Sequence, residues 1–333
     1  MTATQHAAGL GMPAISILIS FFNEERNLPE LLRRLRNVMR SLMSAGGIRE
    51  YELVLVNDNS TDGSLRILLE EAKAERDIVI VNMSRNFGPS ECVLAGLRYT
   101  KGDAVVYLDA DLQDPPEVIP KLIERWKTED DVEVVYTTRL SREGEHPVKL
   151  FVTKLAYRFL ARISAIDLPV DSGDFKLLSR RAVDELLRLN EKRPFLRGLV
   201  TWIGFKQVQV FYNREARFDG RQNTKNPVFG RKVVYNFLDS AMISFSDAPL
   251  KACLFLGLLV SFVSLLYILV VFIQKIMGWY EPGWPALMAA ILLLGGVQLL
   301  MLGVMGLYIS KIYMETTGRP NYIVKEVIRQ DSL

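Results

Sequence analysis

Short apolar runs alternate with amphipathic segments over the first 140 residues of the chain. Five β-branched runs have strand length, and most are followed by apolar positions at helical spacing. The strands are predicted at Ile15–Ser20, Glu52–Asn57, Ile78–Met83, Ala104–Leu108 and Val132–Thr137. The helices are predicted at Leu28–Met43, Asp62–Glu75 (with Ser60 or Thr61 as N-cap), Pro89–Thr100 and Pro116–Lys127. This alternation predicts an α/β fold, in which helices cover both faces of a doubly wound, mostly parallel sheet.

Two stretches near the C-terminus have a different pattern, because no charged side chain interrupts them. Ala252–Ile273 and Trp284–Ser310 contain no Asp, Glu, Lys or Arg, and each exceeds the roughly 20 residues that a helix needs to cross a bilayer. We predict transmembrane helices at about 252–273 and 285–310. The alternative is a pair of buried core helices, which rarely run so long without a charge. No cleaved signal peptide is predicted, because Met1–Gly11 lacks a basic region followed by an apolar one.

These patterns divide the chain into four parts. Residues 1–225 form the predicted α/β domain, 226–250 an amphipathic connector, 251–312 the two spans and 313–333 a C-terminal tail. Lys and Arg flank the spans on the domain and tail sides, whereas the segment between the spans, Gln274–Gly283, carries one Lys and one Glu. Cytoplasmic flanks are enriched in Lys and Arg. We therefore predict a multi-pass protein of the inner (cytoplasmic) membrane, with both termini and the α/β domain in the cytoplasm.

Overall charge and rare residues exclude several kinds of site. The net charge of +3 is too small to indicate nucleic-acid binding, and the basic residues concentrate near the predicted spans. Two distant cysteines, Cys92 and Cys253, provide neither a disulfide framework nor a CxxC metal site. Two histidines, His6 and His146, do not support a His-based zinc site.

Carboxylates follow three of the predicted strands at the point where each strand ends. Glu24 follows the first strand, Asp58 the second, and Asp109 and Asp111 the fourth; ligands of a doubly wound sheet bind beyond these ends. Any one of these residues could be a solvated turn former or helix cap, but three coincident positions favour a functional site. With Gln113, the two aspartates after the fourth strand offer the hard oxygen ligands that Mg²⁺ or Mn²⁺ prefers. Such a metal ion would neutralise charge on a departing diphosphate.

Two amphipathic segments indicate contact with a membrane surface. In Val148–Ile163, Lys154, Arg158 and Arg162 recur every four residues among bulky apolar residues. This pattern suits a helix in the headgroup layer of a lipid bilayer, and the alternative is a helix packed on the domain's own core. Val228–Phe245 leads into the first span and is predicted to connect it to the α/β domain.

Seven short motifs are spread along nearly the whole chain. They are Phe22-Asn-Glu-Glu25, Val56-Asn-Asp-Asn-Ser60, Ser84-Arg-Asn-Phe-Gly88, Asp109-Ala-Asp-Leu-Gln-Asp-Pro-Pro116, Thr138-Arg139, Ser172-Gly-Asp-Phe-Lys176 and Gly318-Arg-Pro-Asn-Tyr322. Together with the paired spans, these motifs resemble family 2 glycosyltransferases of the GT-A fold. Within that family they are most similar to the branch of dolichol-phosphate mannose synthases and bactoprenol (undecaprenyl-phosphate) glucosyltransferases.

The resemblance implies an enzyme that transfers a hexose-type sugar, with inversion, from a nucleotide-diphosphate sugar to a polyprenyl phosphate at the cytoplasmic membrane face. It also implies a homo-oligomer. Asp174 would lie near the acceptor phosphate and act with Asp109 and Asp111 in catalysis, while Asp109, Asp111 and Gln113 would hold Mg²⁺ or Mn²⁺. The implied ligands of the nucleotide sugar are Asn23, Glu24, Asp58, Asp109 and Arg139, and those of the acceptor phosphate, or of a covering loop, are Lys149, Arg217 and Lys225. For Arg139 and Lys149 the alternative is an ordinary solvated basic face.

Departures from the family pattern leave some roles open. Asn59 stands where the family usually has Gly, and the turn is expected to survive because Asn tolerates left-handed backbone angles. Ser20-Phe21-Phe22 replaces the common Pro-x-Tyr, and Gly306-Leu307-Tyr308 replaces Gly-Glu-Tyr, so the role of that Glu is not transferred.

Two other functions compete with lipid-phosphate glycosylation. A processive polysaccharide synthase would normally carry a Gln-x-x-Arg-Trp motif and more spans, whereas Leu122 precedes Arg125-Trp126 here. A non-enzymatic membrane scaffold or nucleotide sensor would have no need for the full set of carboxylates.

Overall fold

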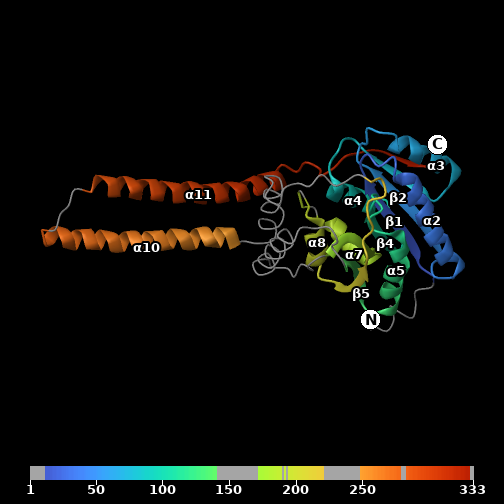
Figure 1. Cartoon of the computed structure of the whole chain (residues 1–333), viewed down its shortest axis with the longest axis horizontal. Helices are drawn as coiled ribbons and strands as arrows, with labels where there is room; N and C mark the ends of the chain where they lie inside the picture. The colour runs from blue at the N-terminus through green and yellow to red at the C-terminus, as the bar shows by residue number, and fades with distance from the viewer. Residues whose placement is uncertain are drawn as a thin grey trace. The chain divides into compact units, whose positions relative to one another are not determined.

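The computed structural model describes residues 12–140, 172–189, 191–192, 194–220, 248–278 and 283–330. These residues fall into two compact units, which are described separately. One is an α/β unit that contains the described residues up to 220 and those from Pro320 onward, and the other is a helical unit between them in sequence. Figure 1 shows the elements of both units.

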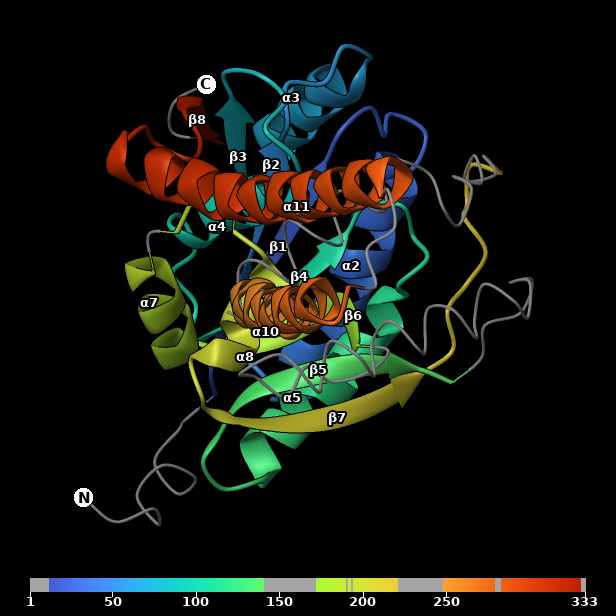
Figure 2. The same cartoon turned by 90° about the vertical axis from the view of Figure 1, so that its left-hand side faces the viewer.

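An eight-stranded mixed sheet forms the centre of the α/β unit, in the order β7-β5-β6-β4-β1-β2-β3-β8 (Figure 2). Strands β4, β1, β2 and β3 are parallel, whereas β6 and β8 run antiparallel to their neighbours. The strands are β1 Ala14–Phe21, β2 Glu50–Asn57, β3 Ile78–Met83, β4 Ala104–Asp109, β5 Val132–Arg139, β6 Ser172–Ser179, β7 Lys206–Tyr212 and β8 Val324–Arg329. The five predicted strands are thus confirmed, and the predicted α/β fold class with them.

Helices cover both faces of this sheet (Figure 1). One layer contains α2 Leu28–Ser44, α3 Ser64–Ala74 and α5 Ile119–Thr128, which continues from a short 3₁₀ turn, η1 Pro116–Val118. The other contains α4 Pro89–Leu97, α7 Arg180–Arg188 and α8 Leu196–Trp202. The predicted N-cap of α3 was wrong, because Gly63 occupies that position. The hydroxyl oxygen of Ser60 instead accepts a hydrogen bond from the backbone N–H of Asn23, and its own N–H donates to the side chain of Asn57. Ser60 therefore belongs to the loop before the helix.

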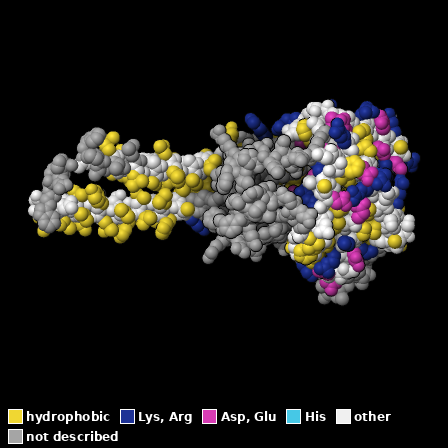
Figure 3. All heavy atoms as spheres, viewed as in Figure 1, with side chains coloured by type: hydrophobic (Ala, Val, Ile, Leu, Met, Phe, Trp, Pro, Cys, Tyr) yellow, Lys and Arg dark blue, Asp and Glu magenta, His cyan; other side chains and the backbone are white. Residues whose placement is uncertain are grey.

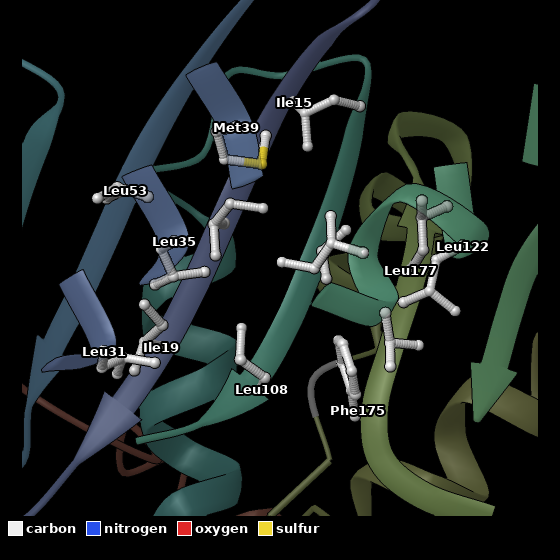
Figure 4. Packing of buried hydrophobic residues seen from close by; sticks show 14 of the residues in the cluster. Ile15, Ile19, Leu31, Leu35, Met39, Leu53, Leu108, Leu122, Phe175 and Leu177 are labelled. Carbon is white, nitrogen blue, oxygen red and sulfur yellow. The ribbon is translucent and has the colours of Figure 1, made fainter. Parts of the chain in front are cut away.

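The core between α2 and the sheet follows from the spacing of apolar residues. Leu31, Leu35 and Met39 recur every four residues on α2 and are fully buried against Ile15 and Ile19 of β1 (Figure 4). Burying each such side chain stabilises the fold by about 1.5–3 kcal/mol. β1 pairs in parallel with β4 on one side and β2 on the other, so the loops that follow these three strands lie at one edge of the sheet.

The C-terminal residues contain an element that the sequence did not predict. Val324–Arg329 forms β8, which pairs antiparallel with β3 at the edge of the sheet. The backbone N–H of Ser84 also donates to the carbonyl of Ile323, at 3.0 Å. The α/β unit is therefore completed by residues that follow the apolar helices in sequence.

The helical unit is a pair of long apolar helices, α10 Ala248–Ile276 and α11 Trp284–Thr316, which contact each other. Within them, Leu250–Ile276 and Leu293–Thr316 are long and apolar enough to cross a membrane, and in neither is the most apolar stretch buried. Many large hydrophobic side chains of the described parts of both helices are exposed, and they are visible on the face shown in Figure 3. An exposed apolar surface of this extent indicates association with a membrane.

Candidate active site

The ends of β1, β2 and β4 bring the predicted carboxylates to one edge of the sheet. Ser20 is in register with Asp109, and Phe21 with Asn57, so the loops after these strands start side by side. The first two loops are bonded to each other, because the backbone N–H of Asn23 donates to Ser60 Oγ at 3.0 Å. The topology thus gathers Glu24, Asp58 and Asp109 as the sequence predicts.

Asp109 stands at the centre of a group of acidic side chains. Burial, and then the charges of Asp174, Asp111 and Asp114, raise the pKa of Asp109 to about 7. Asp114 is fully buried, accepts a hydrogen bond from the hydroxyl of Tyr212, and has its pKa raised mainly by burial. So much negative charge in one place favours a cation.

The oxygen donors at the end of β4 fit a hard divalent ion. Asp111 accepts a hydrogen bond from the backbone N–H of Gln113 at 3.1 Å, and the buried Oε1 of Gln113 has no hydrogen-bond partner within the described part of the chain. Leu112, between them, adopts the left-handed region with φ 58°, a strained conformation for a leucine. Among the described residues no three Asp, Glu, His or Cys side chains are grouped as a complete metal site. Mg²⁺ commonly needs only one or two carboxylates, with water and substrate phosphates as further ligands.

Asp174 lies on β6 and is held by an arginine that sequence reasoning missed. Arg197 of α8 donates from Nε and a terminal nitrogen to the two carboxylate oxygens, at 2.6 and 2.5 Å. Burial alone would raise the pKa of Asp174, but the bonds and charge of Arg197 outweigh it, so the pKa is lowered. Lys176, two residues along β6, is fully buried, and burial lowers its pKa to about 8. Asp174 therefore stays ionised beside two cations.

Asp58 organises the neighbouring loop. Its carboxylate is buried and accepts hydrogen bonds from the backbone N–H groups of Phe87 and Gly88, at 2.7 and 2.9 Å. Gly88 has φ 110°, a conformation that side chains rarely adopt. Asn59 has φ 59°, so the expected left-handed turn is confirmed. Contact of Asp58 with a nucleotide stays a prediction.

Glu24 and Arg217 form an ion pair across the site edge. An Arg217 terminal nitrogen donates to Glu24 Oε1 at 2.5 Å, and its Nε donates to Asp219 at 2.8 Å. Asn27 donates to the other oxygen of Glu24, also at 2.5 Å. Burial raises the pKa of Glu24 despite these partners. The segment around Arg217 is thereby tied to the loop after β1, as a covering loop would be.

Arg139, at the end of β5, donates from Nε to the hydroxyl of Tyr212 at 3.4 Å and adds positive charge next to Asp114 and Asp174. Arg214 also approaches Asp114, at 3.8 Å. Two predicted ligands, Lys149 and Lys225, lie outside the described residues, as do the amphipathic segments Val148–Ile163 and Val228–Phe245. The described site thus combines an acidic centre with a basic border, which suits a metal-bound diphosphate next to a second phosphate.

Of the residues that sequence reasoning missed, Lys176 ends the Ser172-Gly-Asp-Phe-Lys176 motif, but the resemblance implies no role for it. Arg197 lies in a short helix without a motif, so nothing in the sequence singled it out.

Comparisons with known proteins follow the same division of the chain. Residues 16–187 match the model of glycosyl transferase family 2, and residues 248–312 match that of the GtrB C-terminal hairpin. The uncharacterized glycosyltransferase YkcC of Bacillus subtilis is 42% identical, over 93% of each chain. The bactoprenol glucosyl transferase of Shigella phage SfX is 35% identical, over 93% of this chain and 98% of that protein.

Solved structures are more distant. The glucosyl-3-phosphoglycerate synthase from Mycobacterium tuberculosis, in complex with Mn²⁺, UDP and phosphoglyceric acid, has 21% identity and a TM-score of 0.45, over 71% of this chain and 81% of that one. The match of the family model to more than half of the chain, and relatives of this identity over nearly its full length, confirm the resemblance seen in the motifs. The chain is a glycosyltransferase and belongs to glycosyl transferase family 2.

Proposed function

We propose that this enzyme transfers a hexose-type sugar, with inversion, from a nucleotide-diphosphate sugar to a polyprenyl phosphate at the cytoplasmic face of the inner membrane. The observation that carries the proposal is that similarity to a bactoprenol glucosyl transferase extends over 93% of the chain, across both the acidic site and the apolar helix pair. A lipid acceptor explains why both features belong to one chain.

The donor half of the site comprises the loops after β1, β2 and β4. Asp109, Asp111 and Gln113 would hold Mg²⁺ or Mn²⁺, which neutralises charge on the departing diphosphate when bound. Asn23, Glu24, Asp58 and Arg139 are the proposed surroundings of the nucleotide sugar. Asp58 accepts hydrogen bonds from two backbone N–H groups, which supports its role as an anchor of the loop that would border the nucleotide.

The acceptor half needs little proton transfer. A phosphate monoester has its second pKa at about 6 and is largely dianionic at neutral pH, so its oxygen is already a nucleophile. That oxygen bonds to the anomeric carbon as the bond from this carbon to the diphosphate breaks on the opposite face. Because Arg197 keeps Asp174 ionised and fixed in orientation, we assign Asp174 a positioning role at the acceptor rather than that of a base. Arg197 and Arg139 would attract the acceptor phosphate.

Chain connectivity supports a cytoplasmic catalytic domain. The α/β unit precedes α10 in sequence and resumes after α11 with β8, so both ends of the helix pair lead to the same folded unit. Two crossings would place both ends on one side of the bilayer, and the Lys and Arg flanks favour the cytoplasm as that side. A membrane-impermeant thiol reagent added to intact cells should then modify a cysteine introduced at Glu281 but not one introduced at Ser332. The opposite result would contradict the orientation. Copies of the protein would associate with one another through the helix pair.

The direct test is a panel of UDP-, GDP- and dTDP-sugars. Purified full-length protein is incubated with each donor, Mn²⁺ and undecaprenyl phosphate, and the lipid product is identified by mass, with Asp111→Asn as the inactive control. A polyprenyl phosphate carrying one sugar is the expected product. Chains of several sugars would favour the processive synthase, and nucleotide binding without turnover would favour the sensor.

A further inference from the structure

Three polar side chains form a row across β2, β3 and β8 on one face of the sheet. Asn57 is in register with Asn82, and Asn82 with Glu326. The amide nitrogen of Asn57 donates to Asn82 Oδ1 at 2.9 Å, and the amide nitrogen of Asn82 donates to Glu326 Oε1 at 2.8 Å. The row thus runs in one direction, from Asn57 to a carboxylate of the C-terminal strand.

The row continues into the loops at the proposed donor site. The remaining oxygen of the Asn57 side chain, Oδ1, accepts from the backbone N–H of Ser60 at 3.0 Å. Ser60 Oγ in turn accepts from the backbone N–H of Asn23 at 3.0 Å. Glu326 therefore fixes which way the Asn57 amide faces, and this orientation holds the loops after β2 and β1 together.

Both amides are deeply buried, with Asn57 0% and Asn82 3% exposed, and each follows a run of buried apolar residues in its strand. A buried amide without partners is costly, so each side chain has one stable orientation only while its neighbour supplies the matching donor or acceptor. If Glu326 no longer accepts, the amide nitrogen of Asn82 has no partner and the amides can turn over together. The acceptor for the Ser60 N–H would then be replaced by a donor.

We propose that Glu326 is a positioning residue for the nucleotide half of the site, acting through Asn82, Asn57 and Ser60. The inference rests on the proposed function, since it assumes that the loops after β1 and β2 surround the nucleotide. It gives β8 a role in donor binding although the strand lies at the sheet edge and follows the apolar helices in sequence.

Other contacts hold β8 in place independently of Glu326. The backbone ladder to β3 runs from Val79 to Met83. Beyond the strand, Gln330 donates to the carbonyl of Lys73 at 3.1 Å and accepts from Arg76 Nε at 3.1 Å. A change at Glu326 therefore tests the row of side chains rather than the docking of the strand.

The experiment compares Glu326→Met, which removes the acceptor, with Glu326→Gln, which keeps an oxygen at the same reach. Gln330→Met is the matched control, because it weakens the docking of the C-terminal segment without touching the row. Binding of UDP, GDP and dTDP in the presence of Mn²⁺ is measured by calorimetry, and KM and kcat are measured for the donor and for undecaprenyl phosphate. Hydrogen exchange of the peptide containing Ser60 gives a readout that does not depend on turnover.

Glu326→Met should raise the Kd of the nucleoside diphosphate and the KM of the donor about fivefold. It should leave kcat and the KM of the acceptor unchanged, and hydrogen exchange of the peptide containing Ser60 should become faster. Glu326→Gln and Gln330→Met should stay within about twofold of the unaltered protein. If Glu326→Met does not fold, Glu326→Ser replaces it, since the shorter side chain cannot reach Asn82. Equal nucleotide affinity in the Met or Ser variant and the unaltered protein overturns the inference alone. No nucleotide binding by the unaltered protein overturns the proposed function and the inference together.

Discussion

Replacing Asp109 with asparagine should stabilise the metal-free protein above neutral pH. The folded state raises the pKa of this carboxyl from its ordinary 3.8 to about 7, through burial and the charges of Asp174, Asp111 and Asp114. Because the folded state holds the proton more tightly than the unfolded chain, the contribution of Asp109 to stability is greatest below pH 4, falls as the pH rises to about 7, and is level above it. The uncharged amide of the Asp109→Asn variant would carry no such penalty.

The pKa difference corresponds to roughly 4 kcal/mol once the carboxyl is fully ionised. Less than half of this is already lost at pH 5, so at most about 3 kcal/mol separates pH 5 from pH 8. Water that reaches the partly exposed carboxylate screens its charge, which reduces the expected difference to about 2 kcal/mol. For a domain of this size, about 2 kcal/mol shifts Tm by about 4–8 °C.

The assay is thermal unfolding of Asp109→Asn and the unaltered protein, in detergent with chelator, at pH 5 and pH 8. The Tm advantage of the variant should be larger by about 4–8 °C at pH 8. Adding Mn²⁺ at pH 8 should remove the difference by stabilising only the unaltered protein. Asp184→Asn, at an exposed carboxylate on α7, is the matched control. A difference between Asp109→Asn and the unaltered protein that is the same at both pH values would refute the raised pKa.

Three further substitutions test the division of the site. Asp111→Ala should abolish Mn²⁺-dependent binding of the nucleoside diphosphate in calorimetry while leaving Tm unchanged, and unchanged affinity would remove Asp111 from the metal site. Lys149→Ala should raise the KM for polyprenyl phosphate far more than that for the nucleotide sugar, whereas loss of donor binding alone would place Lys149 at the diphosphate. A lysine at position 197 cannot make two parallel hydrogen bonds to Asp174. Arg197→Lys should therefore lower kcat about 10- to 100-fold and leave the Kd of the nucleotide within about twofold. Steady-state rates close to those of the unaltered enzyme would show that the ion pair is only structural.

The sequence predicted the centre of the fold because the signals there are local. Strand periodicity located β1 to β5, and parallel pairing made the carboxylates at their ends neighbours. The edge strand β8 and the inner strand β6 were harder to predict. In β8, charged residues interrupt the apolar ones, as in a solvated tail. In β6, Gly173, Asp174 and the buried Lys176 obscure the strand pattern.

The ion pairs of the site could not be predicted, because they join distant parts of the chain. Arg197 is 23 residues from Asp174, and Arg217 is 193 residues from Glu24. Their geometry depends on where α8 and the segment after β7 pack, and nothing in the sequence around either arginine encodes that packing. The family resemblance singled out Asp174, Arg217 and Glu24, but neither Arg197 nor the pairing of Arg217 with Glu24.

Three unfavourable features coincide within five residues at the end of β4. The pKa of Asp109 is raised to about 7, Leu112 has a left-handed backbone, and the buried Oε1 of Gln113 has no partner within the described residues. Each costs free energy in the isolated protein, and unfavourable features that are retained together indicate function rather than stability. A divalent cation would offset two of them, since it would favour ionised Asp109 and accept the Gln113 oxygen as a ligand. The left-handed turn at Leu112 joins Asp111 to Gln113, whose backbone N–H donates to the Asp111 carboxylate, so the strain belongs to the same arrangement. The physical cost of this segment therefore supports the proposed metal site independently of the family resemblance.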